Sequence, residues 1–351
     1  MKLAFALLAA FSLFASAAAL ADDAGGPYKL LKSVTVGGDG RWDLITVDSD
    51  NRRFYVPRSN RVDVYDADTL AKVGEVAGTN GVHGVAIDPS SGHGFTSNGG
   101  GPSVTMFDIK TLQVIKTIPV TGRPDSIFLD PTTKHVFLES HAAPHVTVID
   151  SADGTVLGTI DLGGGPEFGA GDGNGHVYIN VEDTREVVVV DPVAMKVTAR
   201  YKLGEGEGPS GMGLDAKNRR IFAFCGNEKM VVLDADNGNI LATLPTGRGT
   251  DGGTFDPDTM EAFSSNGNAT LTVVKENSPT SFEVEQNVAT KAGARTCALD
   301  SKTHNIFLVT AAFEAPATQP GASTQPAAGG QRRARPRMIP GSFMILVVGK
   351  D

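Results

Sequence analysis

The chain has 351 residues, a formal net charge of −9, 42 glycines and 19 prolines. Its apolar share of 40% is too high for a disordered chain, and its acidic balance does not favour nucleic acid as a partner. Abundant glycine with 7% aromatic residues is typical of a turn-rich all-β protein.

The first 21 residues have the parts of a secretory signal peptide. Lys2 is a minimal positive start, residues 3–14 are almost wholly apolar, and residues 19–21 (Ala-Leu-Ala) form a small-x-small cleavage site. This apolar run is too short for a membrane span, and no later segment of the sequence approaches a spanning length. We therefore predict cleavage after Ala21, a periplasmic or secreted mature protein, and no transmembrane segment.

Residues 22–29 are expected to be a linker, and residues 30–351 carry a repeat. In each copy a Gly-rich loop leads into a short apolar run that ends in Asp, and an aromatic residue follows six or seven positions later. Successive aspartates are 40 to 44 residues apart. We call these residues the repeat aspartates: Asp48, Asp88, Asp130, Asp172, Asp215, Asp256 and Asp300. The aromatics are Tyr55, Phe95, Phe137, Tyr178, Phe222, Phe263 and Phe307.

Four β-type runs in a repeat of this length predict a propeller blade. The third run of each copy is expected at residues 62–65, 104–107, 146–149, 187–190, 230–233, 271–274 and 343–348. Seven copies predict an all-β, seven-bladed β-propeller with four antiparallel strands per blade. Because stacked blades bury both faces of each sheet, the aromatic of the second run is expected in the core between blades.

The two chain ends are expected to meet in the last blade. The seventh copy ends at Asp351 after its third run, and residues 30–36 (LLKSVTV) resemble the fourth runs of other copies. We therefore predict that this N-terminal strand is the outer strand of blade seven. The two cysteines, Cys225 and Cys297, fall in blades five and seven, which are not neighbours, so two unpaired and mostly buried thiols are expected.

Residues 314–341 interrupt the last blade with five prolines and with Arg332, Arg333, Arg335 and Arg337. This composition predicts a disordered loop between the second and third strands. The arginines could bind an anionic partner such as nucleic acid or a membrane surface, but a solvated loop is favoured because the chain as a whole is acidic.

The second-strand phrases FYVPRSN (54–60), GFTSNGG (94–100), VYINVED (177–183) and IFAFCGN (221–227) resemble the YVTN-type propeller repeat, a family that includes YncE-like periplasmic proteins. The resemblance extends over essentially all of residues 30–351, although no copy reads Tyr-Val-Thr-Asn. It implies the propeller fold and no particular activity, since the family has no shared catalytic motif. Members of the family include binding proteins, a single-stranded DNA binder and electron-transfer partners.

One position of the repeat gathers polar residues. Five residues before each repeat aspartate, where the inner strand of the blade begins, stand the residues that we call the ring residues: Asp43, His83, Asp125, Glu167, Ser210, Asp251 and Arg295. We predict that they surround the mouth of the central channel and bind a ligand. The second strands should end at the same face, with Arg58, Asn98, His141, Glu182, Asn227 and Asn266.

Two interpretations of the ring residues remain open. Carboxylate oxygens suit hard divalent cations such as Ca²⁺ or Mg²⁺, and a histidine admits Mn²⁺ or Zn²⁺. The candidate metal ligands are Asp43, His83, Asp125, Glu167 and Asp251. Alternatively, a water-filled channel needs polar walls, and these side chains could bond to the loops of neighbouring blades. Arg295 fits a bound anion or an internal ion pair.

Other motifs are weaker. Residues 206–211 match G-x-G-x-x-G but lead into a strand, where a dinucleotide site needs a helix. Residues 234–238 resemble the start of a calcium loop but lack its closing Glu, so a β-turn is expected. His93, His135, His176 and His304 are expected in solvated turns on the opposite face.

The sequence favours an exported, monomeric, non-catalytic binding or scaffold propeller, whose channel-mouth face takes a small ligand, a divalent cation or a protein partner. The alternative is a metal-dependent propeller enzyme of lyase, hydrolase or oxidoreductase type at the same site. Motifs of the types Gly-x-Ser-x-Gly, His-Glu-x-x-His and Cys-x-x-Cys do not occur in the sequence. The sequence therefore identifies no catalytic set, and whether the protein is an enzyme stays open.

Overall fold

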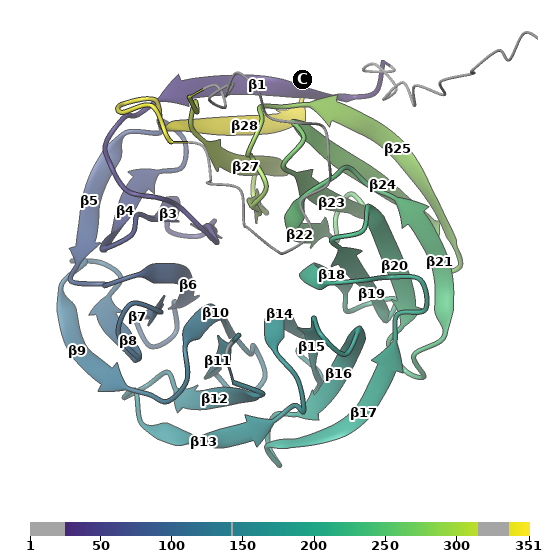
Figure 1. Cartoon of the computed structure of the whole chain (residues 1–351), viewed down its shortest axis with the longest axis horizontal. Coiled ribbons are helices and arrows are strands. Elements are labelled where there is room, and N and C mark those ends of the chain that lie inside the picture. The colour runs from purple at the N-terminus through teal and green to yellow at the C-terminus, as the bar shows by residue number, and fades with distance from the viewer. Residues whose placement is uncertain (1–24, 142, 315–336) are drawn as a thin grey trace, which may run out of the picture.

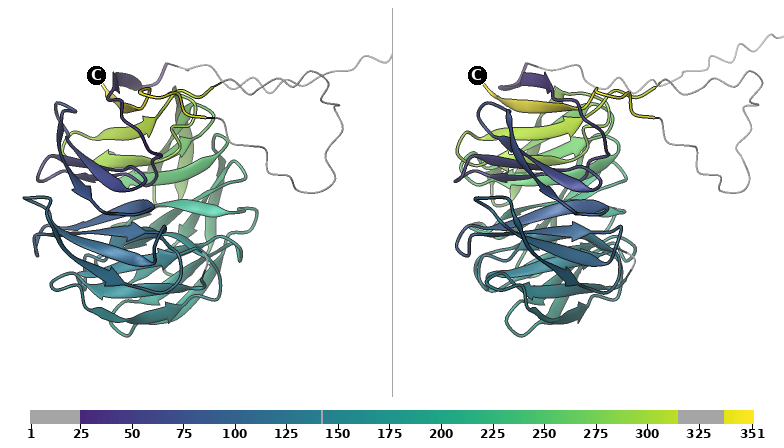
Figure 2. Two further views of the ribbon diagram at one scale, coloured as in Figure 1. Left: turned by 60° about the vertical axis from the view of Figure 1, so that its left-hand side comes forward. Right: turned by 90° about the vertical axis from the view of Figure 1, so that its left-hand side faces the viewer.

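Seven four-stranded antiparallel sheets stand around a central axis in the computed structural model, which describes residues 25–141, 143–314 and 337–351 (Figure 1). The side views show the blades stacked as a thick disc (Figure 2). In the described ranges no helix is long and apolar enough to cross a membrane. The predicted signal peptide (1–21) and most of the predicted disordered loop (314–341) lie outside them. The prediction of a seven-bladed all-β propeller is confirmed.

Within each blade the strands follow chain order from the axis outward, except in the last. Blade one holds β2 (Thr46–Asp48), β3 (Arg53–Pro57), β4 (Arg61–Asp66) and β5 (Lys72–Ala77). Blade two holds β6 (Val82–Asp88), β7 (His93–Asn98), β8 (Ser103–Asp108) and β9 (Val114–Pro119). Blade three holds β10 (Pro124–Leu129), β11 (His135–Ser140), β12 (His145–Asp150) and β13 (Val156–Asp161). Blade four holds β14 (Pro166–Gly171), β15 (Val177–Val181), β16 (Glu186–Asp191) and β17 (Lys196–Lys202).

Blade five holds β18 (Pro209–Asp215), β19 (Arg220–Cys225), β20 (Lys229–Asp234) and β21 (Ile240–Pro245). Blade six holds β22 (Thr250–Asp256), β23 (Glu261–Asn266), β24 (Thr270–Ser278) and β25 (Ser281–Ala289). Blade seven holds β26 (Cys297–Asp300), β27 (Asn305–Thr310), β28 (Met344–Lys350) and β1 (Tyr28–Thr35). Each predicted third run therefore coincides with a third strand.

The repeat aspartates are all buried, and their carboxylates hold the turn that follows the inner strand. The N–H of Asn51 donates to Asp48, and that of Thr133 donates to Asp130 over 2.9 Å. Asp accepts such bonds because its short side chain reaches the backbone two or three residues ahead. The interval between repeat aspartates in the sequence is therefore the interval between these turns, each of which is held by its own aspartate.

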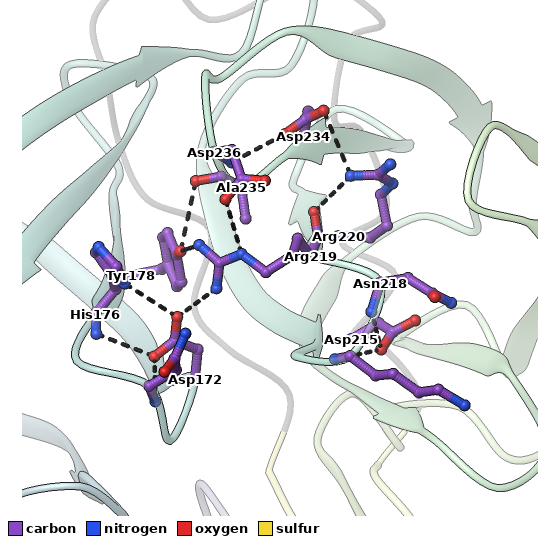
Figure 3. Close-up of polar contacts among 12 residues, drawn as sticks. Asp172, His176, Tyr178, Asp215, Asn218, Arg219, Arg220, Asp234, Ala235 and Asp236 are labelled. Carbon is purple, nitrogen blue, oxygen red and sulfur yellow. Dashed lines mark hydrogen bonds and ion pairs between the residues drawn. The ribbon is translucent and has the colours of Figure 1, made fainter.

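The same carboxylates also join neighbouring blades. Asp172 of blade four pairs with Arg219 of blade five, whose guanidinium also donates to the Tyr178 hydroxyl (2.8 Å) and pairs with Asp236 (2.8 Å) (Figure 3). Equivalent links run from Asp300 to Arg52, from Asp256 to His304 and from Asp88 to Ser151, at 2.6 to 2.8 Å. Each link ties the inner strand of one blade to a turn of the next.

The apolar core lies between the blades rather than within them. Phe54 of blade one packs against Phe307 of blade seven, with ring centroids 5.0 Å apart. The seven second-strand aromatics are at most 2% exposed. The prediction that they belong to the core between blades is therefore confirmed.

The N-terminal strand closes the ring as predicted. In blade seven the strand order is β26-β27-β28-β1, with β1 antiparallel to β28 at the outer edge. The strand begins two residues earlier than the predicted 30–36. Tyr28 is buried against Phe263 of blade six (5.3 Å between ring centroids), its hydroxyl donates to Glu261, and Lys350 lies 4.7 Å above its ring.

Both cysteines are free, as predicted. Cys225 is buried and Cys297 is half-buried. Burial raises the pKa of the Cys225 thiol to about 12 and that of Cys297 to about 11. Thiols in such surroundings stay protonated and are poor nucleophiles.

A pair of buried carboxyl groups lies at the border of two blades, Asp215 in blade five and Glu276 in blade six. The outer hairpin of blade six is long, and Glu276 near the end of β24 is 3% exposed and accepts a bond of 3.0 Å from Asn218. Glu276 Oε2 and Asp215 Oδ2 lack hydrogen-bond partners among the described residues. Burial, together with the charge of Asp215, raises the pKa of Glu276 to about 7.

Replacing Tyr28 tests the closure. We expect Tyr28→Ala to lower the free energy of unfolding by about 3 to 5 kcal/mol, because it empties a buried site between the N-terminal strand of blade seven and blade six. Lys29→Ala changes the next residue and removes an exposed ion pair with Asp351. It should lower the free energy of unfolding by less than about 1 kcal/mol. Chemical denaturation of both variants measures the difference, and equal small effects would contradict the closure.

The Glu276 carboxyl should make stability depend on pH. Its folded pKa is raised, so the unfolded chain releases the proton first, and stability should fall as pH rises from about 4.5 to about 7. Glu276→Gln should remove that component and stabilise the protein at pH values above 7. Denaturation of both proteins across this range tests the prediction, and parallel pH profiles would refute it.

Candidate functional site

The structure shows how the ring residues leave the regular pleat of the inner strands. In blades two to six the ring residue is the second residue of the inner strand: His83 in β6, Asp125 in β10, Glu167 in β14, Ser210 in β18 and Asp251 in β22. In all five strands the pairing with the second strand shifts register at this residue. Such bulges redirect side chains out of the regular pleat. Asp43 and Arg295 lie in the loops before β2 and β26.

Three of the ring residues form a first cluster. His83 Nδ1 lies 2.7 Å from Asp43 Oδ2 and 3.3 Å from Asp125 Oδ1. The three side chains are 22% to 24% exposed. The hydrogen bond to Asp43, helped by the charge of Asp125, raises the pKa of His83 although burial opposes it. The imidazole is thus held between two carboxylates from neighbouring blades.

A second cluster adjoins the first and shares Asp125 with it. His141 Nδ1 lies 2.5 Å from Glu167 Oε1 and 3.8 Å from Glu182 Oε2. In the first cluster, ligand atoms of Asp43, His83 and Asp125 lie within 4.8 Å of one another. In the second, the same is true of Asp125, His141 and Glu167. His141 and Glu182 follow the second strands of blades three and four, so this part of the predicted channel-mouth face is present.

Negative charge accumulates around these clusters. Burial and the nearby charges of Asp125, Glu182 and Asp251 raise the pKa of Glu167 to about 9. Burial likewise raises the pKa of Asp251 to about 6, although the charge of Arg295 acts to lower it. Burial also raises the pKa of Asp125, although the charge of His83 acts to lower it. Carboxyl groups that resist ionisation in this way favour a proton or a cation among them.

Sequence reasoning missed a carboxyl group behind the clusters. Glu139 on β11 is 0% exposed and accepts a hydrogen bond from Ser126, while its Oε1 has no partner in the described part of the chain. Burial raises its pKa to about 8. The available signal was an acidic residue within the apolar run VFLES, where the corresponding residues in blades two and six are Ser97 and Ser265.

The remaining ring residues do not join the clusters. Arg295 Nε pairs with Asp251 Oδ2 at 3.1 Å, which is the internal ion pair that the sequence left open. Ser210 donates to the carbonyl of Thr250 in the next blade at 3.2 Å, so its hydroxyl links two blades. The wide ring therefore divides into local groups.

Most of the second-strand residues have structural contacts. Arg58 is fully buried, donates to the carbonyl of Asp39 over 2.6 Å and lies 3.7 Å from the centre of the Phe343 ring. Asn98 and Asn266 are buried and bond to threonines of their own sheets, and Asn227 bonds the preceding loop. Only His141 and Glu182 contact the clusters.

The histidines of the opposite face are less solvated than predicted. All four are half-buried rather than exposed, because the turns pack against neighbouring blades. His304 Nδ1 lies 2.8 Å from Asp256, and His93 Nδ1 lies 2.9 Å from the Ser151 carbonyl oxygen. The side chains of His176 and His304 are still 44% and 39% exposed, so the prediction of solvated residues holds only in part. Asp256, Asp258 and His304 form a third group with metal-ligand spacing.

The two weak motifs behave as predicted. Residues 206–211 lead into strand β18, so the helix that a dinucleotide site needs is missing there. Residues 234–238 form a turn in which the N–H of Asp236 donates to Asp234 over 2.9 Å and Gly238 has a φ of +75°.

The fold and its channel-mouth clusters define a seven-bladed β-propeller with a polar mouth. Residues 43–172 match the family model of the YNCE-like beta-propeller, and with the seven blades this confirms the resemblance to YncE-like proteins. No curated protein sequence matches the chain.

Solved structures resemble the chain in fold. The structure of U3-55K has a TM-score of 0.71 at 9% identity, covering 92% of this chain and 99% of its own. The RRP9 WD40 repeats give 0.73 at 9% identity, with 93% and 99% covered. A chain of the mitotic checkpoint complex gives 0.70 at 14% identity, with 86% and 95% covered. At these identities the likeness concerns the fold alone.

Proposed function

We propose that the protein is an exported binding propeller that holds a divalent cation at its channel mouth, between Asp43, His83 and Asp125. The observation that supports this proposal most directly is the first cluster, which brings two carboxylates and an imidazole from three consecutive blades within ligand distance of one another. Export is supported by the signal-peptide pattern of residues 1–21.

The dimensions and chemistry of the cluster suit a small cation. Metal–ligand bonds of about 2.0 to 2.4 Å require donor atoms separated by no more than about 4.8 Å, and the three donor atoms meet that limit. Oxygen with imidazole ligands suits Mn²⁺ or Zn²⁺ better than Ca²⁺. His141 and Glu167 lie beside the cluster through the shared Asp125, and could complete the ligand set or hold a second ion.

The protein ligands would leave part of the coordination sphere open toward the channel. A small polar molecule or a side chain of a protein partner could occupy the open positions, which supports a binding or scaffold role. Three protein ligands with an open position are also the arrangement of catalytic metal sites, so a metal-dependent enzyme is our second candidate. Cation binding without turnover of ester, lactone or phosphate substrates would favour the binding protein.

The test is thermal and chemical unfolding in chelator and then with single divalent cations. At about 100 times its dissociation constant, a cation that binds only the folded state adds about 2.7 kcal/mol to the free energy of unfolding. We expect such a gain for Mn²⁺ or Zn²⁺, and its loss in Asp125→Asn, which removes a ligand while keeping the side-chain shape.

Asp258→Asn is the matched control. It removes the same charge from the third group, on the opposite face, and should leave the gain intact. A gain that survives Asp125→Asn but disappears in Asp258→Asn would move the site to the opposite face. No gain with any cation would overturn the proposal and leave the first cluster as a structural contact in which His83 lies between two carboxylates of neighbouring blades.

A further inference from the structure

A cavity lies where blades seven and one meet, on the channel-mouth face. Its volume is about 710 Å³, and its side chains are of two kinds. Three are arginines, and three are large and apolar. They are Arg41, Arg295 and Arg337 with Trp42, Phe313 and Met338. We call this cavity the arginine pocket.

The apolar wall of the arginine pocket is part of the folded core. Trp42 packs against Phe313 and Phe343, with ring centroids 6.0 Å and 5.3 Å apart. Phe313 and Met338 form a β-bridge, and the Glu314 N–H donates to the Arg337 carbonyl oxygen over 2.8 Å. Main-chain hydrogen bonds thus fix the segment that carries Arg337. The wall exists before any ligand arrives, which lowers the entropic cost of binding.

The charges of the pocket are unusual in an acidic chain. The guanidinium groups of Arg41 and Arg337 make no ion pair or side-chain hydrogen bond within the described ranges, although the chain carries 40 acidic residues. Arg295 pairs with Asp251, whose Oδ2 lies 3.1 Å from its Nε. Among the described residues, those that line the pocket include no carboxylate. Two arginines without an ion pair in the described ranges thus stand, together with the paired Arg295, beside an aromatic wall in which Phe313 is 39% exposed.

We infer that the arginine pocket binds a small organic anion: a carboxylate or phosphate ester with an aromatic body. A guanidinium donates two parallel hydrogen bonds to either oxyanion, and an aromatic ring can stack on Trp42 or Phe313. The cavity volume lies in the range of small-molecule sites, so a ligand of this kind can enter it. This inference is independent of the proposed cation site.

Calorimetric titration in chelator tests the inference without the cation. The probes are phenylacetate and phenyl phosphate, with benzyl alcohol and acetate as controls for the charge and the ring. We expect both aromatic anions to bind at least about tenfold more tightly than either control, since each control lacks one of the two interactions. The tighter of the two anions identifies the carboxylate or the phosphate as the preferred group.

The pocket contains its own reporter, because Trp42 is the single tryptophan of the chain. Binding in the pocket must therefore change the intrinsic tryptophan emission with the same dissociation constant as calorimetry. A calorimetric binding signal without any change in tryptophan emission would place the ligand elsewhere and overturn the inference. Benzyl alcohol that binds as tightly as phenylacetate would reduce the site to an apolar hollow and also overturn it.

Arginine variants locate the anion contact. Arg41→Gln and Arg337→Gln should each weaken phenylacetate binding about fivefold, the value of one partly solvated charge-assisted hydrogen bond. Arg53→Gln is the matched control, because it removes the same charge at the start of β3, at the opposite end of the blade. Equal weakening by all three variants would indicate a net-charge effect and refute the pocket.

Discussion

The buried aspartate at the end of each inner strand is the interaction on which the rest of the structure depends. Removing an ionised carboxylate from water is costly unless hydrogen bonds replace the water, so each Asp needs donors at fixed positions. Its own turn supplies some donors, and in four blades the adjacent blade supplies another. Although burial acts in the opposite direction, bonds from Ser151 and Ser90 keep the pKa of Asp88 below its usual value. One residue type therefore sets both the turn and the distance between blades.

The buried aspartate fixes one end of the inner strand, so the residues at the other end are free to serve a function. There, in blades two to six, bulges take the ring residues out of the regular pleat. Neighbouring ring residues pair with one another rather than with one central atom. The result is an uneven face, with carboxylates and histidines in blades one to four and arginines at the junction of blades seven and one.

The sequence predicted the blades, their strands and the closure because periodicity and alternation follow directly from backbone geometry. The position of the ring residues in the repeat could also be read from the sequence, and in blades two to six it coincides with a register shift of the inner strand. It could not predict how those side chains pair. Arg58 and His141 each directly follow the second strand of their blade, yet only His141 reaches the clusters, while Arg58 is buried over Phe343. The arginine pocket was beyond prediction because only its Arg295 stands at a position that we read from the repeat, and its other arginines come from the loop before β2 and from the insertion in blade seven.

The place of the arginine pocket gives it a relation to the closure of the ring. Closure in a propeller brings the first and last blades together, and here the contact is made by β1 at the outer edge and by Trp42, Phe343 and Phe54 nearer the axis. Arg41 enters from the side of blade one, and Arg337 belongs to blade seven. An anion between them therefore contacts both sides of the junction between blades seven and one, which the chain crosses between β1 and β2. Such a ligand opposes separation of these blades, so that recognition and closure of the ring stabilise each other.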